Sequence, residues 1–358
     1  MSLQPLSNQK AEIAFREKLY LQQVQGKALF DDEFDSVRME NILEERMKKT
    51  LTQMALLRDR DVLLSPYIEI GAERCQRSLV MENDVGASGC AVDISYHLLK
   101  SCHHYQQAFK KPKAPIRVCC DANNLPFRTG AIPFVFCYET LHHFPEPAPV
   151  VREIYRVLSP GGFFFFDEEP YKKILHINLY SGNKIYSRDH LTRSIARKLL
   201  DRLFAAPTCN EVEHGVIEND EISIAQWKLA LAPFTKKDVQ LTPSDNLSMQ
   251  ADLFNPGNYL KRLLVILLGG KVSGICQKTL QEGAAAAAAT PVLETLICPS
   301  CKASSVEAPI TRTDSGFVCM RCLRPYPVVD DVLFLFTPDK LSELYPDVLS
   351  VAGQRQAG

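Results

Sequence analysis

The chain has 358 residues, enough for one large and one small domain, and its 41 Lys and Arg nearly balance its 42 Asp and Glu. This balance excludes a strong overall field that would attract nucleic acid or a membrane. The amino terminus lacks the apolar stretch of a secretory signal, and the longest apolar run, Leu263–Leu268, is too short to span a bilayer. We therefore predict a cytoplasmic protein without a membrane span, whose twelve cysteines are reduced thiols.

Residues 8–60 are rich in charged side chains and contain no proline and a single glycine, Gly26. Apolar side chains such as Met39, Leu43 and Met47 recur there at helical spacing. This pattern predicts an amino-terminal helical cap over residues 1–62.

From residue 66 the pattern changes to short apolar runs separated by helical stretches. The runs are residues 66–71, 89–94, 116–121, 134–138 and 163–167, and a final strand is expected near Lys271–Gln277. Such runs are typical of buried parallel strands. Their spacing indicates repeated strand–helix units, so we predict an α/β fold with a doubly wound sheet that binds ligands at the carboxyl ends of its strands.

Three acidic residues, Glu69, Asp93 and Asp121, stand at or near the ends of the first three predicted strands. If the ligand is S-adenosylmethionine, Asp93 can accept hydrogen bonds from both ribose hydroxyls and Asp121 from the adenine amino group. Gly71 would let the backbone approach the ligand. Acids at strand ends also serve as ordinary helix caps, so each residue taken alone leaves both interpretations open.

Four further motifs follow in order: residues 121–127, 141–147, 153–162 and 167–170. With them, residues 66–170 resemble class I S-adenosylmethionine-dependent methyltransferases, most closely the branch of quinone-biosynthesis C-methyltransferases and small-molecule methyltransferases. The resemblance implies a seven-stranded Rossmann-like sheet in a methyltransferase domain over residues 63–283. It also implies a substrate-cover insertion at about 171–260.

The same resemblance implies the cofactor-binding residues. The methionine side would be lined by Glu69, Gly71 and Ala72, the ribose and adenine by Asp93 and Ile94, and the adenine edge by Asp121 and Ala122, with Cys137 beneath the sulfonium. The glycine-rich motif of the family departs here to Gly71-Ala-Glu-Arg-Cys75, which keeps only the first glycine. The carboxylate of Glu73 would either crowd the methionine carboxylate or pair with the ammonium beside it.

His142 and His143 are the candidate catalytic residues, since an imidazole can take a proton from the methyl acceptor. The alternative is that they only shape the pocket. Methyl transfer from an activated sulfonium needs little more than in-line positioning.

Residues 171–204 contain eight Lys or Arg and two acids. This stretch suits a phosphate, a carboxylate or a nucleic acid backbone. A solvated helix face is the alternative, because Ile195, Leu199, Leu200 and Leu203 give the stretch an apolar side.

The six alanines Ala284–Ala289 mark a linker over residues 284–291, which we expect to be followed by a zinc ribbon over 292–340 and a tail over 341–358. Two Cys-x-x-Cys pairs, Cys298 with Cys301 and Cys319 with Cys322, are separated by seventeen residues. Four thiolates at this spacing can bind one structural zinc ion, which would replace the core that so small a segment cannot build. Chance pairs or a redox dithiol are the alternatives.

Residues 295–338 also resemble the small zinc-binding activator of tRNA- and ribosome-modifying methyltransferases, through Ile297–Cys301, Gly316–Cys319 and Pro325–Phe336. One departure is Asp331, where that family turns on a glycine. The carboxyl-terminal part is not basic, with six Lys or Arg and eight acids from residue 291 on, so nucleic acid is an improbable partner.

These features predict methyl transfer from S-adenosylmethionine to an O, N or C nucleophile of a small or conjugated metabolite. One alternative is an RNA or translation-factor methyltransferase with a built-in zinc activator module. Another is a non-catalytic scaffold with a degraded cofactor motif, although such a scaffold would have no use for Asp93 and Asp121.

Overall fold

The computed structural model of the protein describes residues 8–25, 36–172, 180–181, 205–206, 215–217, 219, 222–243, 249–255, 257, 259–280, 290–314 and 316–348. Most of the predicted substrate-cover insertion, nearly all of the basic stretch and the six alanines of the predicted linker lie outside these residues. No described helix is long and apolar enough to cross a membrane.

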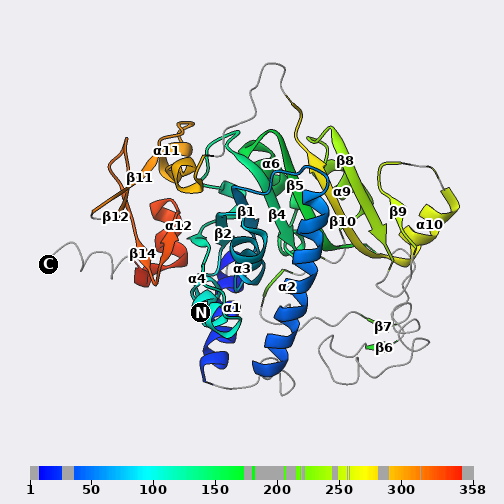
Figure 1. The fold of residues 1–358 in the computed structure, drawn as a ribbon, viewed down its shortest axis with the longest axis horizontal. Coiled ribbons are helices and arrows are strands. Elements are labelled where there is room, and N and C mark those ends of the chain that lie inside the picture. Colours follow the sequence, from blue (N-terminus) through cyan, green and yellow to red (C-terminus); the bar gives the residue numbers. More distant parts are fainter. Residues whose placement is uncertain are drawn as a thin grey trace, which may run out of the picture.

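A ten-stranded sheet runs through the centre of the molecule (Figure 1). The five strands expected from the apolar runs are all present and pair in parallel. They are β1 (Tyr67–Ile70), β2 (Gly89–Asp93), β3 (Ile116–Cys119), β4 (Ile132–Tyr138) and β5 (Leu158–Tyr171). Their order in the sheet is β3-β2-β1-β4-β5, so the chain reverses direction across the sheet between β3 and β4. The predicted doubly wound α/β fold is confirmed.

The sheet is larger than the predicted seven strands. After β5 come the antiparallel strands β10 (Gly270–Gln277), which matches the expected final strand, and β8 (Lys236–Thr242). These complete a set of seven, and β9 (Ala251–Asp252) adds to β8 at one edge. At the other edge, β15 (Val332–Phe334) pairs in parallel with β3 and carries β14 (Val328–Val329) beside it. The sequence prediction assigned β15 to the zinc ribbon, because residues 332–336 belong to the segment that resembles the zinc-binding activator.

Helices cover both faces of the sheet, because successive strand residues point to opposite sides. One face packs against α1 (Asn8–Val24), α2 (Ser36–Arg58) and α4 (Tyr96–Lys100), so the predicted amino-terminal helices are present. The other face packs against α6 (Pro147–Val157) and α9 (Ile224–Ala230), with Trp227 of α9 stacked on Phe166. Further elements are α3 (Gln76–Val80), η1 (Met81–Val85), α5 (Cys102–Ala108), η2 (Ala122–Asn124), η3 (Leu141–His143) and α10 (Tyr259–Leu268), with a separate pair of short strands, β6 (Tyr180–Ser181) and β7 (Ala205–Ala206).

The four cysteines of the two pairs lie in a small carboxyl-terminal unit, residues 290–326, which we call the four-cysteine module. It contains η5 (Val292–Thr295), α11 (Pro299–Lys302) and a three-stranded sheet of β11 (Ile310–Thr313), β12 (Gly316–Cys319) and β13 (Pro325–Tyr326). The chain then enters the main sheet as β14 and β15 and ends in α12 (Pro338–Leu344), which crosses the predicted boundary at residue 340. In Figure 1 these elements, orange to red, lie at the opposite side of the sheet from α10.

The turn between β14 and β15 contacts helix α4 beside the sheet. Asp330 and Asp331 both have a left-handed backbone, with φ of 48° and 58°, so Asp331 takes the conformation for which the resembled family uses glycine. The carboxylate of Asp330 accepts a hydrogen bond from Tyr96 and lies 2.6 Å from Lys100 Nζ. Both partners belong to α4, which follows β2.

Candidate functional site

A cavity of about 340 Å³ opens at the carboxyl ends of β1, β2, β3 and β4. Ligands bind at this edge in open α/β sheets, where the order of the strands reverses. Six of the residues predicted for the site line it: Gly71, Asp93, Ile94, Asp121, Ala122 and His143. Other lining residues come from α1 (Asn8, Gln9, Glu12 and Arg16) and from the segment after β4 (Glu139, Thr140, Phe144 and Pro145).

Gly71 begins the loop after β1, and the structure leaves no room there for a side chain. Its φ is +68°, and a Cβ would lie 2.3 Å from Thr140 Oγ1 and 2.5 Å from Thr140 Cγ2. Thr140 follows β4, the neighbour of β1, and its hydroxyl donates to the carbonyl of Tyr138 at 2.8 Å. Only glycine fits both the left-handed backbone and this close contact.

The glycine-rich motif that this loop resembles has glycine at two further positions, occupied here by Glu73 and Cys75. The backbone is left-handed at both. Glu73 has φ of 45° and Cys75 has φ of 60°. A left-handed residue other than glycine costs roughly 1 to 2 kcal/mol, so the surrounding contacts must hold the loop. Two of these contacts are hydrogen bonds from Glu73 N to Asp93 Oδ2 at 2.9 Å and from Cys75 N to Ala72 O at 2.7 Å.

The side chain of Glu73 reaches the cavity among several arginines. Arg46 of α2 bridges Glu73, at 3.2 Å, and Glu139, at 3.0 Å. Burial opposes the charge of Glu73, but the arginines lower its pKa to about 2; they are Arg46, Arg74, Arg16 and Arg77. Glu73 is therefore a carboxylate at neutral pH, and the charges around it suit a zwitterionic ligand group such as an amino acid.

Asp93 and Asp121 stand at the ends of β2 and β3, and backbone N–H groups orient both. Asp93 accepts from Ser95 N at 2.7 Å and from Glu73 N, while Asp121 accepts from Asn123 N at 2.8 Å. Burial raises the pKa of Asp93 to about 6, so its carboxylate is ionised at neutral pH. Both oxygens of Asp93 and Oδ2 of Asp121 can each accept a further hydrogen bond from a ligand hydroxyl or amine, whereas Asp121 Oδ1 already accepts two from Asn123.

The amino-terminal helix α1 contributes a contact that the sequence did not indicate. Gln9 Nε2 donates to Asp121 Oδ2 at 2.7 Å, and Gln9 Oε1 accepts from Lys340 Nζ of α12 at 3.0 Å. The two ends of the chain therefore meet at this side of the cavity. No local motif could predict the contact, because 112 residues separate Gln9 from Asp121.

Four of the predicted site residues do not line the cavity: Glu69, Ala72, Cys137 and His142. Glu69 is fully buried and accepts from Ser78 Oγ of α3 at 2.6 Å, and burial raises its pKa to about 7. Ala72 and Cys137 are also fully buried, and burial keeps Cys137 a neutral thiol by raising its pKa.

The two candidate catalytic histidines differ in their surroundings. His142 is buried, and its Nδ1 lies 3.0 Å from Glu169 Oε2, whose carboxylate also accepts from Thr140 N at 2.7 Å and Leu141 N at 2.9 Å. Glu169 therefore fixes the segment after β4, a role that the sequence analysis missed although the acidic motif at 167–170 was noted. His143 lines the cavity, and its Nδ1 donates to Ile217 O at 3.0 Å, which leaves Nε2 as the basic nitrogen of the neutral ring.

The four cysteines of the two pairs meet in the four-cysteine module. Their sulfur atoms all lie within 4.8 Å of one another, with 3.7 Å between Cys298 and Cys322 and 3.8 Å between Cys301 and Cys319. A tetrahedral zinc ion with Zn–S bonds of about 2.3 Å holds its sulfurs about 3.8 Å apart. Backbone N–H groups point at two of the sulfurs, from Cys301 to Cys298 and from Cys322 to Cys319. This donor set fits a structural metal ion.

A family comparison matches the part of the chain that contains strands β1 to β4, whose ends surround the cavity. Residues 68–166, from β1 to β5, match the family described as a methyltransferase domain. The chain carries a methyltransferase domain. Outside this domain lie α1 and α2, the strands from β8 on and the whole four-cysteine module, and the match does not extend to them.

Two curated relatives are named as uncharacterized chloroplastic methyltransferases of Arabidopsis thaliana. At1g78140 is 29% identical over 133 residues, which cover 33% of this chain and 38% of the relative. At2g41040 is 32% identical over 77 residues, which cover 21% of this chain and 22% of the relative. The chain thus spans well under half the length of either relative.

Among solved structures, a chain from the complex of the Haloferax volcanii Trm112 methyltransferase activator with a methyltransferase matches 67% of this chain. The match covers 94% of that chain, with 14% identity and a TM-score of 0.38.

We expect purified protein to contain about one equivalent of zinc, since the four sulfurs are spaced for one tetrahedral ion. Replacing Cys298→Ser together with Cys322→Ser should abolish the zinc signal in elemental analysis. The matched control is Cys90→Ala with Cys276→Ala, two buried thiols outside the four-cysteine module, which should keep it. Unchanged zinc in the first variant, or less than half an equivalent in protein prepared without chelator, would exclude the site.

Gly71→Ala should destabilise the fold more than Gly86→Ala. Both glycines are left-handed, with φ of +68° and +72°, but a Cβ at Gly86 meets nothing within 4 Å. Gly86→Ala should cost about 1 kcal/mol for the backbone alone, and Gly71→Ala about 3 kcal/mol or more because of the clash with Thr140. Urea unfolding of the two variants measures the difference, and equal losses would mean that Thr140 does not press on Gly71.

Proposed function

We propose that the protein transfers a methyl group from S-adenosylmethionine to an O, N or C nucleophile of a small or conjugated metabolite. The observation that carries this proposal is the meeting of Gly71, Asp93 and Asp121 at one cavity, at the carboxyl edge of a methyltransferase domain. These residues stand at the ends of three different strands. A cavity of about 340 Å³ is large enough for a nucleotide-sized ligand.

In this proposal each wall of the cavity binds a different part of S-adenosylmethionine. Asp93 accepts from the ribose hydroxyls, and Asp121 with Ala122 binds the adenine edge. The ion pair of Arg46 with Glu73 meets the charged amino acid part of the cofactor. The cofactor supplies the activated methyl group, so the chain has only to hold the acceptor in line with it.

The methyl acceptor would bind on the side formed by Glu139, Thr140, His143 and Phe144. His143 is a better candidate for a proton acceptor than His142, because its ring faces the cavity while Glu169 holds the ring of His142. In this proposal Glu169 acts on the site indirectly, by orienting the segment after β4.

We also propose that the four-cysteine module binds a structural zinc ion. The four thiolates complete the tetrahedral shell and leave no open position for a substrate, as is usual for structural zinc. The metal would support a segment with little apolar core of its own.

An RNA or translation-factor methyltransferase is the second candidate. The observation that favours it is the pairing of β15 with β3, which makes the segment that resembles an activator part of the main sheet. The acidic balance of the carboxyl-terminal part opposes it.

Asp93→Ala should weaken binding of S-adenosylhomocysteine by about 1.5 to 3 kcal/mol, because two hydroxyls lose a charged acceptor. Isothermal titration measures the loss, with Asp84→Ala as a control on the exposed end of η1, where Asp84 pairs with Lys111. Since burial raises the pKa of Asp93 to about 6, wild-type affinity should also fall as the pH drops below 6. Wild-type affinity in Asp93→Ala would exclude this binding mode.

A test of the basic stretch can distinguish the two candidate functions, although Arg193 and Arg197 lie outside the described part. If Arg193 and Arg197 bind RNA, each phosphate neutralised adds roughly 0.7 to 0.9 to the slope of log affinity against log salt. We expect only weak RNA binding at moderate salt, measured by fluorescence anisotropy with labelled cellular RNA. Submicromolar, salt-sensitive binding that disappears in Arg193→Ala with Arg197→Ala would favour the RNA methyltransferase instead.

A further inference from the structure

The segment between β3 and β4, residues 121–130, joins the cofactor cavity to the four-cysteine module. Its first residues, Asp121, Ala122 and Asn123, line the cavity. Its later residues pair with the module: Phe127 forms a β-bridge with Leu296, and Arg128 N donates to Thr295 O at 2.7 Å. One short stretch of backbone is therefore shared between the two sites.

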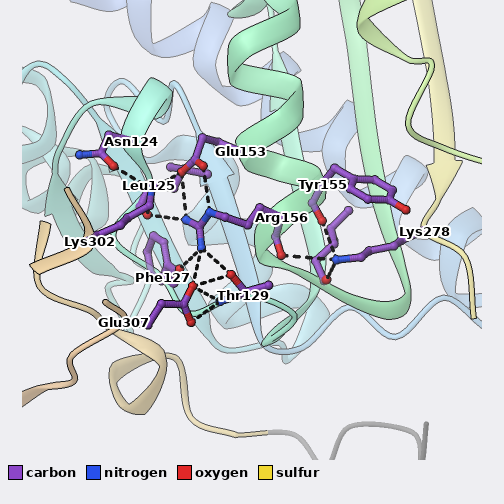
Figure 2. A network of polar contacts seen from close by, with 11 residues as sticks. Asn124, Leu125, Phe127, Thr129, Glu153, Tyr155, Arg156, Lys278, Lys302 and Glu307 are labelled. Atoms are coloured by element: carbon purple, nitrogen blue, oxygen red, sulfur yellow. Dashed lines mark hydrogen bonds and ion pairs between the residues drawn. The ribbon is translucent and has the colours of Figure 1, made fainter. Parts of the chain in front are cut away.

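Lys302 extends this connection from the cysteine cluster itself. It directly follows Cys301 at the end of α11, and its ammonium donates to Asn124 Oδ1 at 2.7 Å and Leu125 O at 3.2 Å. It also forms an ion pair with Glu153 of α6. Figure 2 shows the lysine reaching from the module toward η2, the short helix that holds Ala122 and Asn123.

The same segment is held from the side of α6 by Arg156. Its guanidinium donates to the backbone carbonyls of Leu125, at 2.8 Å, and Phe127, at 2.7 Å, and pairs with Glu153 (Figure 2). Glu307 of the module accepts from Thr129 N at 3.1 Å and pairs with Arg156 at 3.3 Å. Charged donors and acceptors thus add to the backbone pairing of Phe127 and Arg128 with the module, and such contacts are stronger than neutral hydrogen bonds.

The position of Lys302 depends on the turn between Cys298 and Cys301, since α11 spans only Pro299–Lys302. Metal binding orders cysteine turns of this kind, because the ligands have no preformed site without the ion. Lys302, next to Cys301, therefore connects this turn directly to Asn124 and Leu125. Its side chain is 15% exposed, so water competes little for these contacts.

We propose that Lys302 is a positioning residue through which metal binding at the four-cysteine module orders the adenine side of the cofactor cavity. The proposal rests on the proposed function, because both the metal ion and the cofactor belong to it. The two ligands then bind cooperatively. By thermodynamic linkage, the factor by which zinc raises cofactor affinity equals the factor by which the cofactor raises zinc affinity.

The first test compares three variants of the full-length, zinc-loaded protein: Lys302→Met, Lys302→Arg and Arg312→Met. Arg312 lies on β11 of the same module and is exposed, so it serves as the control. Titration with S-adenosylhomocysteine should show affinity at least about fivefold lower in Lys302→Met, within the usual range of coupling between sites. Affinity in Arg312→Met should be unchanged, and Lys302→Arg should recover part of the loss.

Hydrogen exchange and zinc content separate positioning from a general loss of structure. In Lys302→Met, exchange should rise at the amides of residues 122–127 and stay unchanged in β4 and β5, while the zinc content remains that of the wild type. Affinity and exchange equal to those of Arg312→Met would overturn the proposal. Loss of zinc from Lys302→Met would also overturn it, because Lys302 would then act on the metal site alone.

The second test uses the wild-type protein and needs no variant, so it applies even if Lys302→Met fails to fold. Zinc affinity, measured by competition with a chromogenic chelator, should rise at least about fivefold with saturating S-adenosylhomocysteine. Equal zinc affinity with and without this ligand overturns the proposal. If the wild type binds no S-adenosylhomocysteine at all, the proposed function fails. In that case, zinc removal should still raise hydrogen exchange at residues 122–127, and unchanged exchange would overturn the proposal for Lys302.

Discussion

The cavity depends on one contact, the close approach of Gly71 to Thr140. Because β1 and β4 pair in parallel, the residues that follow these strands must pass each other at the same edge of the sheet. With a Cβ position 2.3 Å from Thr140 Oγ1, no side chain fits between them. A glycine therefore lets the chain turn sharply away from β1, and this turn brings the N–H of Glu73 to Asp93. The space at this end of the sheet stays open because only backbone, without a side chain from Gly71, passes Thr140.

Carboxylates cross-link the loops around the cavity, as metal ions or disulfides do in other proteins. Asp93 accepts from the loop after β1, Asp121 from its own turn and from α1, and Glu169 from the segment after β4. Hydrogen bonds from backbone N–H to a carboxylate are stronger than those between neutral groups, so each acid fixes a loop that lacks regular pairing. The acids at the strand ends thus build the cavity, and two of them also line it.

The sequence predicted those parts of the molecule whose cause is local. The five parallel strands follow from their apolar runs, and the four cysteines meet as their spacing required. Contacts between segments that are distant in the chain could not be predicted in this way. The sequence predicted Cys137 and Glu69 for the site; both are fully buried and do not line the cavity, and a family motif alone does not tell which face of a strand meets the ligand. The sequence analysis missed Gln9, Glu169 and Lys302, whose partners are distant in the chain and leave no periodic signal.

The addition of β15 to the sheet explains how the four-cysteine module is held in place. Without β15, β3 would be an edge strand with unpaired backbone groups, which folded proteins usually cover. Once β15 occupies that edge, the module packs on the same apolar core as the methyltransferase domain, with Leu296 and Tyr326 in one cluster with Phe127. The module therefore needs no large core of its own. The turn between Cys298 and Cys301 lies near residues 121–130 for the same reason, because β15 pairs with β3 and this segment directly follows β3 in the chain. The topology of one sheet edge thus brings the four-cysteine module next to the cavity, although 178 residues separate Asn124 from Lys302 in the chain.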